Sequence, residues 1–137
     1  RISSTPSIAP AKGLLTSAYG DRSDPITGER SLHRGIDIGT APNRPVRATA
    51  DGIVTRTGRD GALGTAVSMS HGFGIVTRYG HLSKAVVEPG QQVRQGDVVG
   101  YVGKSGRATG YHLHYEVRVD GRPVNPLGYV LDGLGGR

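Results

Sequence analysis

The stretch that decides the fold lies near the C-terminus, at residues 111–119, and reads YHLHYEVRV. Aromatic and β-branched residues dominate it, and turn-forming residues border it, Gly110 before and Asp120-Gly121 after. Successive side chains of a strand point to opposite faces of a sheet, so His112 and His114 project from the same face. The stretch therefore predicts a strand that presents two imidazoles on one side of a sheet.

An upstream segment, HRGID at residues 33–37, complements this strand. Gly35 and the isoleucines at 36 and 38 favour a strand over a helix. His33 and Asp37 share one parity, so the imidazole and the carboxylate are expected to point the same way while the isoleucines enter the core. Two nitrogens and one oxygen on rigid strands, with a position left for water, suit a catalytic Zn²⁺ site.

Either motif alone is more often structural than metal-binding. A histidine pair in a strand commonly faces solvent, and an isolated H-x-x-x-D pattern is weaker still. The chain has only 5 histidines, however, so the presence of both motifs shifts the interpretation to a metal site.

Composition predicts one compact all-β domain. Hydrophobic residues make up 35% of the 137 residues, and 23 glycines stand among β-branched residues and turn signals. We expect an extended N-terminal segment at 1–13, the domain at 14–130 and a C-terminal tail at 131–137. The absence of cysteine excludes disulfides, thiolate ligands and a cysteine nucleophile.

The chain carries a net charge of +6, which favours anionic partners through long-range attraction. The chain has one Phe and no Trp, and it has no basic stripe interleaved with stacking aromatics. We therefore expect no nucleic-acid partner. No apolar stretch approaches the roughly 20 residues of a transmembrane helix. The chain starts at Arg1 without Met, so we expect a processed or truncated piece, and missing targeting signals say little about destination.

Hydrophobic alternation and turn residues predict the order of the strands. We expect strands at 14–19, 34–39, 46–50, 52–57, 65–70, 75–79, 86–87, 92–93, 98–102 and 111–119. A turn-rich loop is expected at 20–31, a glycine-bracketed loop at 104–110 and a single helical turn within 123–130.

Five blocks of sequence occur in an order that resembles a known family, the LytM/lysostaphin-type zinc endopeptidases. The blocks are HRGIDIGTAP, PVRATADGIV, HGFGIVTRYGHLS, GQQVRQGDVVGYVG and ATGYHLHYEVRVDGRPVNP, and the match spans residues 14–130. The resemblance implies an antiparallel sheet core, smaller barrel-sandwich-like strands beside it, and an open groove that contains zinc.

The resemblance also assigns roles to residues. It implies that His33, Asp37 and His114 bind Zn²⁺, that His81 and His112 are catalytic without binding the metal, and that the substrate is bacterial peptidoglycan. The lead-in DPITGERSLH resembles Gram-negative members that cut D-Ala–diaminopimelate cross-links. A glycyl-glycine endopeptidase of the same family is the alternative specificity.

The same resemblance places the chain in the cell envelope, periplasmic or extracellular. It implies a monomer, with upstream regulatory or anchoring domains outside this chain. A non-enzymatic cell-wall regulator of the same fold is a further alternative, but such members typically lack zinc ligands, and here every ligand position is filled.

Hydrolysis of a peptide bond by zinc-bound water needs a proton acceptor, which the zinc site alone does not supply. The chain has no H-E-x-x-H helix and hence no glutamate base of the usual metalloprotease type. Imidazole titrates near neutrality, so two histidines beside the metal suit general-base and oxyanion-stabilising roles, in an order that the sequence leaves open.

Three other polar residues receive weaker assignments. His71 is expected to be a non-catalytic turn histidine. Glu116 shares the face of His112 and His114, and either orients a histidine or pairs with a cation across strands. Asp21 and Arg22 are expected to make loop contacts.

A carrier module is the alternative from another functional class. Residues 87–100 resemble the hairpins of biotinyl and lipoyl carrier domains, which need a modifiable lysine at an exposed tip. Neither Lys84 nor Lys104 stands in such a motif, and this interpretation leaves the histidines unexplained. We attribute the similarity to shared barrel-sandwich geometry.

Overall fold

The structure is a computed structural model that describes residues 5–23, 27–106, 108, 110–129 and 134–135. Within these residues it contains strands and two short 3-10 turns and no α-helix, which confirms the all-β prediction. The strands are β1 Gly13–Ser17, β2 Gly20–Ser23, β3 Arg30–His33, β4 Ile36–Gly39, β5 Pro45–Arg47, β6 Gly52–Arg59, β7 Thr65–Ser70, β8 Ile75–Ala85, β9 Gln92–Val93, β10 Val98–Val102, β11 His112–Val119, β12 Arg122–Val124 and β13 Leu134–Gly135. The turns are η2 Gly61–Leu63 and η3 Pro126–Gly128.

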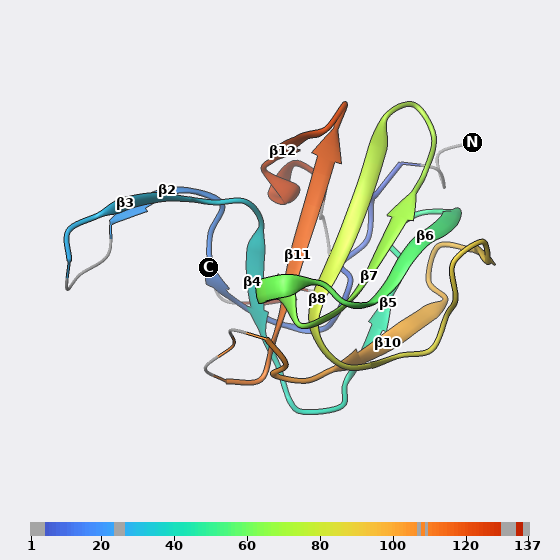
Figure 1. Ribbon diagram of the computed structural model, residues 1–137, viewed down its shortest axis with the longest axis horizontal. Coiled ribbons are helices and arrows are strands. Elements are labelled where there is room, and N and C mark those ends of the chain that lie inside the picture. Colours follow the sequence, from blue (N-terminus) through green and yellow to red (C-terminus); the bar gives the residue numbers. More distant parts are fainter. Residues whose placement is uncertain (1–4, 24–26, 107, 109, 130–133, 136–137) are drawn as a thin grey trace.

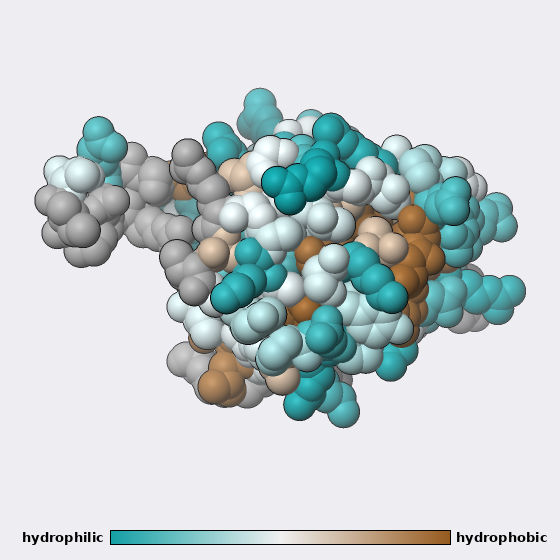
Figure 2. Space-filling view, turned by 60° about the horizontal axis from the view of Figure 1, so that its bottom comes forward, coloured by the Kyte–Doolittle hydropathy of each residue, from teal (hydrophilic) through white to brown (hydrophobic). Residues whose placement is uncertain are grey.

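One large sheet organises the molecule. Its main path runs β13-β1-β4-β11-β8-β7-β6-β9, with β12 beside β11 and β10 joining β8 to β5. Apart from the parallel β1–β13 pair, all strand pairs of this sheet among the described residues are antiparallel. The two remaining strands, β2 and β3, form a separate hairpin that stands away from the sheet as an arm (Figure 1). The space-filling view shows a mostly hydrophilic surface on the main body, with hydrophobic side chains exposed in a few places (Figure 2).

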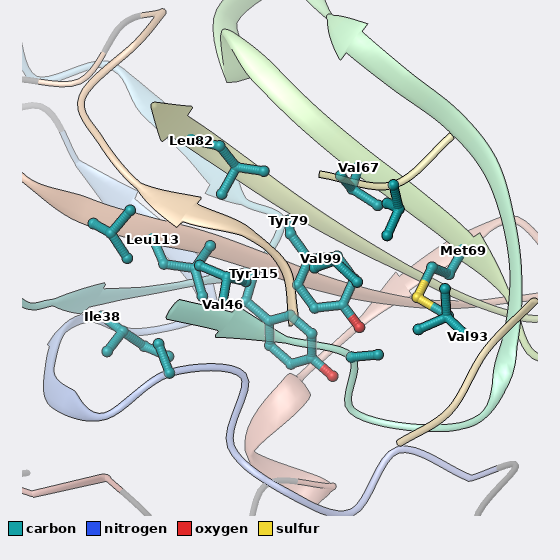
Figure 3. Packing of buried hydrophobic residues seen from close by; sticks show 14 of the residues in the cluster. Ile38, Val46, Val67, Met69, Tyr79, Leu82, Val93, Val99, Leu113 and Tyr115 are labelled. Atoms are coloured by element: carbon teal, nitrogen blue, oxygen red, sulfur yellow. The ribbon is translucent and has the colours of Figure 1, made fainter. Parts of the chain in front are cut away.

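Strand β11 lies between β4 and β8 and has two functionally different faces. Leu113, Tyr115 and Val117 are fully buried and pack in the hydrophobic core (Figure 3 labels the first two). The intervening side chains, including His112 and His114, point to the opposite face, as the two-residue period of a strand requires. The expected burial of the isoleucines at 36 and 38 is confirmed, since both have no exposed surface.

A chain of hydroxyl groups crosses the buried side of the sheet. The Tyr115 hydroxyl lies 2.7 Å from Thr49 Oγ1, which lies 3.2 Å from the Tyr79 hydroxyl. The Tyr79 hydroxyl in turn lies 2.9 Å from Thr77 Oγ1. The two tyrosine rings are 5.4 Å apart between centroids, and Figure 3 shows both inside the core. Buried polar groups are tolerated when they are hydrogen-bonded, and here each one has a partner.

His71 ends this chain on the far side from the groove described below. Its Nδ1 donates to the Asp51 carbonyl at 2.7 Å, and its Nε2 lies 2.7 Å from Thr77 Oγ1. Burial is the largest influence on the imidazole and lowers the pKa of His71 below 6.5, against the contribution of the Asp51 carbonyl. His71 therefore has a structural role, in agreement with its expected non-catalytic assignment.

The structure corrects several expectations about the strands. Residues 20–23 and 30–33 form paired strands rather than a loop, because the arm is held by backbone bonds and shows no hydrophobic alternation. Residues 86–87 are not a strand, although the Val86 amide donates to the Val99 carbonyl at 2.9 Å. β8 extends past residue 79 to Ala85, which places His81 inside a strand rather than beyond its end.

The remaining segments follow the expected order with shifted boundaries. The strand expected at 46–50 is the short β5, and β6 continues two residues beyond its expected end. The helical turn expected within 123–130 is η3, which the Asn125 side chain caps by accepting from the Leu127 amide at 3.0 Å. Of the expected tail, residues 131–133 and 136–137 lie outside the described residues, and β13 pairs with β1.

The lowered pKa of His71 predicts how stability depends on pH. The unfolded chain binds a proton at His71 near pH 6.5, whereas the folded chain binds it only at lower pH. The free energy of unfolding should thus fall as pH decreases below about 6.5, by at most about 1.4 kcal/mol per pH unit for this group. Urea unfolding at pH 7.5, 6.5 and 5.5 measures how the free energy of unfolding changes with pH.

A His71→Gln variant is the control, since it removes the titrating group. Its free energy of unfolding should fall less steeply over the same pH range than that of the parent. Equal pH slopes for the two proteins would show that His71 does not contribute to the acid sensitivity.

Candidate metal centre

An open groove of about 590 Å³ lies between the arm and η2, with β8 and β11 as its floor. His33 lines it from the arm, residues 60–63 line it from the opposite side, and the floor carries the histidines at 81, 112 and 114. All five predicted site residues therefore border one cavity. They belong to four strands, β3, β4, β8 and β11, so this convergence is a property of the fold.

His33, Asp37 and His114 form a compact group whose candidate ligand atoms all lie within 4.8 Å of one another. His33 Nε2 is 3.3 Å from Asp37 Oδ2, and His114 Nδ1 is 2.9 Å from Asp37 Oδ1. With zinc–ligand bonds of about 2.0–2.2 Å, donor atoms of a tetrahedral site lie roughly 3.3–3.5 Å apart. The three donors thus surround one point, and side-chain shifts would bring them to the spacing of a zinc site.

Backbone pairing brings these residues together. His114 is opposite Asp37 in the β4–β11 ladder, so the two side chains start from adjacent positions on one face. His33 belongs to a different strand, because the chain bends at residues 34–35 between β3 and β4. A Cβ at Gly35 would overlap the Tyr115 carbonyl oxygen, so glycine lets this bend lie directly against β11. The expected continuous strand from 34 to 39 is therefore wrong, although the residues still converge.

Each histidine of the metal group has one nitrogen held by the protein and one directed to Asp37. His33 Nδ1 donates to the Ala18 carbonyl at 2.8 Å. His114 uses the other atom, since its Nε2 donates to Glu116 Oε2 at 2.9 Å. Outer hydrogen bonds of this kind fix ring orientation and tautomer in metal sites, and here they leave His33 Nε2 and His114 Nδ1 for the ion.

The electrostatics of the group favour an ionised carboxylate. Burial alone would raise the pKa of Asp37, but hydrogen bonds from His114 and His33 outweigh it and lower that pKa well below its ordinary value. Burial lowers the pKa of His114, whereas hydrogen bonds to Asp37 and Glu116 raise it more, to about 9. In the metal-free protein a proton on His114 thus occupies the place that a cation would take.

His81 and His112 lie beside this group and face each other, with ring centroids 4.9 Å apart. His112 Nδ1 donates to the Gly110 carbonyl at 3.1 Å, and its Nε2 is 3.9 Å from Asp37 Oδ1. His81 Nδ1 donates to the Ser105 carbonyl at 2.7 Å. Both rings therefore keep Nε2 for the groove. Burial, with the neighbouring histidines, lowers the pKa of His81.

Ser105 positions His81, and no sequence motif indicated it. Its hydroxyl accepts from the Thr65 amide at 3.0 Å and donates to the Leu82 carbonyl at 2.7 Å, while its carbonyl holds the His81 ring. His81 itself has a φ of 62°, a left-handed conformation that is uncommon outside glycine. Such strain persists where surrounding contacts impose it and is concentrated at functional sites.

Glu116 satisfies both of its alternative assignments. It accepts from His114, and its other oxygen lies 3.5 Å from Arg78 Nη1 and 3.1 Å from Arg118 Nε. Arg78 also donates to Asp60 Oδ2 at 2.7 Å. The carboxylate thus both orients the His114 ring and forms part of a charged wall. Asp21 lies exposed in β2, and the side chain of Arg22 lies outside the described residues.

A family model, Peptidase family M23, matches residues 31–126. The DD-carboxypeptidase/endopeptidase Mpg of Neisseria meningitidis serogroup B is 47% identical over 117 residues, which cover 85% of this chain and 27% of that protein. The chain thus spans about a quarter of the length of the curated relatives that it matches.

Two solved structures share the fold at substantial identity. A zinc-containing peptidase from Vibrio cholerae superposes with a TM-score of 0.81 at 36% identity, covering 90% of this chain and 38% of that one. The catalytic domain of the prophage-encoded M23 protein EnpA from Enterococcus faecalis superposes with a TM-score of 0.77 at 33% identity. The match covers 89% of this chain and 97% of that one.

The donor geometry predicts which residues retain metal. Replacing two of the three donors, as in Asp37→Ala with His114→Ala, should abolish stoichiometric zinc because one imidazole cannot hold the ion. A His81→Ala variant is the matched control and should keep one zinc per chain. Elemental analysis after dialysis measures the zinc content of both variants. Full zinc retention by the double variant would contradict the assignment of Asp37 and His114 as zinc ligands.

The Glu116–His114 hydrogen bond predicts a smaller effect from outside the ligand set. Glu116→Gln removes the charge that supports His114 and should weaken zinc affinity about 10- to 100-fold. Competition with a chelating dye measures the affinity, and Glu88→Gln, on the exposed surface, provides the control. An unchanged affinity in Glu116→Gln would limit this residue to pairing with the two arginines.

Proposed function

The chain belongs to peptidase family M23, and from that premise we propose that it is a zinc-dependent endopeptidase that hydrolyses D-Ala–diaminopimelate cross-links of bacterial peptidoglycan. One observation supports this proposal most strongly. Four histidines of one groove each use one nitrogen to bond another group of the protein. In three of them, His33, His112 and His114, the other nitrogen lies within 3.9 Å of an Asp37 carboxylate oxygen.

The donor set fits Zn²⁺. Two imidazole nitrogens and one carboxylate oxygen are typical of catalytic zinc sites, which leave a further position open. His33, Asp37 and His114 would hold the ion, and a bound Zn²⁺ would lower the pKa of water and polarise a scissile carbonyl.

The remaining histidines handle protons. His81 and His112 each donate Nδ1–H to a backbone carbonyl, so Nε2 is the atom that accepts a proton in the neutral ring. One of the pair takes the proton of the attacking water, and the other, carrying a proton, donates a hydrogen bond to the oxyanion that develops on the substrate. In this geometry, either histidine can perform either task.

The proposed bond follows from the relatives' chemistry. The Neisseria relative is a DD-carboxypeptidase/endopeptidase, and a Vibrio cholerae relative that is 42% identical over 106 residues is a peptidoglycan DD-endopeptidase. Glycyl-glycine cleavage remains the alternative specificity. A non-enzymatic regulator is the less favoured alternative, since all three donors and both further histidines are present here.

The setting of this activity is the cell envelope. Peptidoglycan lies outside the cytoplasmic membrane, so we place the chain in the periplasm or the extracellular space, acting as a monomer on the wall. Within the described part of the chain, no helix has the length and hydrophobicity of a membrane span. The net charge of +6 would attract the chain to the anionic wall.

Loss of the proton-handling histidines should separate metal binding from turnover. His81→Ala and His112→Ala should each keep zinc and lose about 10²- to 10⁴-fold in kcat, because the proton transfer or the oxyanion contact is removed. The measurement is hydrolysis of a defined cross-linked muropeptide dimer, with products assigned by mass spectrometry.

His71→Gln provides a histidine control outside the groove and should turn over at the parent rate. Parent-level turnover in either groove variant would refute the role given to that residue. Cleavage of pentaglycine but not of the D-Ala–diaminopimelate dimer by the parent would favour the alternative specificity.

A further inference from the structure

Three arginines line the groove beside the candidate metal centre, at positions 34, 78 and 118. They differ in what they contact. Arg78 lies between the carboxylates of Asp60 and Glu116, and Arg118 bonds Glu116. Their charges are thus largely matched within the protein.

Arg34 is different, because among the described residues no carboxylate, hydrogen-bond acceptor or aromatic ring contacts its side chain. It is exposed, yet it lines the groove rather than the outer surface. A guanidinium presents a planar fork of donors that matches a carboxylate in two parallel hydrogen bonds. Arg34 is therefore the cation of the groove wall that is available to an anionic ligand.

The backbone fixes where the Arg34 side chain begins. Arg34 directly follows His33, whose imidazole belongs to the metal group, and directly precedes Gly35, which lies against Tyr115 and Glu116. The residue is thus held on both sides, next to the point where a scissile bond would lie. A substrate carboxylate close to the cleaved amide would therefore lie within reach of Arg34.

The proposed substrate has such a carboxylate. In a D-Ala–diaminopimelate cross-link, the carbon that carries the scissile nitrogen also carries a free carboxylate. The same holds for a terminal D-Ala–D-Ala bond, which is what a DD-carboxypeptidase cleaves. A glycyl-glycine bond inside a bridge has no charge at this place.

We propose that Arg34 binds the free carboxylate on the carbon bearing the scissile nitrogen and so selects D-Ala amides of this kind over neutral bonds. The proposal rests on the proposed function and names the residue that sets its specificity. It also predicts that the groove accepts a terminal D-Ala–D-Ala bond as well as the internal cross-link, because both offer the same anion at the same distance from the cleaved bond.

A matched substrate pair tests the contact. One substrate is a synthetic D-Ala–diaminopimelate dimer with the free carboxylate, and the other has that carboxylate as a carboxamide. Zinc-loaded parent, Arg34→Gln, Arg34→Lys and Arg94→Gln are compared by the ratio of kcat/KM for the two substrates. Arg94 is exposed and outside this groove, so its variant controls for net charge.

The parent should prefer the carboxylate, and Arg34→Gln should reduce that preference about 10- to 100-fold, as expected for a charge-assisted hydrogen bond. Arg34→Lys should keep part of the preference, since it retains charge but not the fork. Arg94→Gln should match the parent. Binding of the same pair to a zinc-loaded His112→Ala background, with and without Arg34→Gln, should show the same loss in Kd without any turnover.

The outcomes separate this inference from the function it rests on. If the parent cleaves the dimer but Arg34→Gln keeps the full preference, or the parent shows none, the role of Arg34 is refuted while the endopeptidase assignment stands. If the parent cleaves pentaglycine and neither dimer, the proposed bond specificity fails and the role of Arg34 fails with it.

Discussion

The antiparallel pairing of β4 with β11 is the constraint on which the site depends. It sets His114 opposite Asp37, and the bend at Gly35 then brings His33 to the same point. Hydrogen bonds to Ala18 and Glu116 take one nitrogen of each imidazole and leave the other for a cation. A slip of one residue in this ladder would turn His114 into the core and Tyr115 into the groove, so fold and site cannot be separated.

The two faces of β11 show how the same strand serves stability and chemistry. On one face, Tyr115 enters the core and its hydroxyl joins the buried chain that ends at His71. On the other face, Glu116 links the metal group to the arginines of the groove wall. The charged wall is thus continuous with the candidate metal centre, and a substrate anion in the groove would meet both.

Glycines, β-branched residues and turn signals predicted the all-β class, and the resemblance to the LytM/lysostaphin family implied the antiparallel sheet core. The two histidine motifs indicated the candidate metal ligands, whereas the assignment of His81 came from the resemblance alone. The arm was missed because its strands are polar and pair only through backbone bonds, which leaves no hydrophobic pattern. Ser105 and the Arg78–Asp60 pair were missed because they depend on contacts between segments distant in sequence. The full length of β8 was missed because His81 has a positive φ inside it, which alternation does not indicate.

The central claim is that three specific atoms hold one zinc ion. Crystals soaked in zinc and measured at the zinc absorption edge would give its position directly from anomalous scattering. The account predicts a single peak at about 2.0–2.2 Å from His33 Nε2, the Asp37 carboxylate and His114 Nδ1, with Glu116 still accepting from His114 Nε2. A peak coordinated by His114 Nε2, or one that lies on other residues, would contradict it.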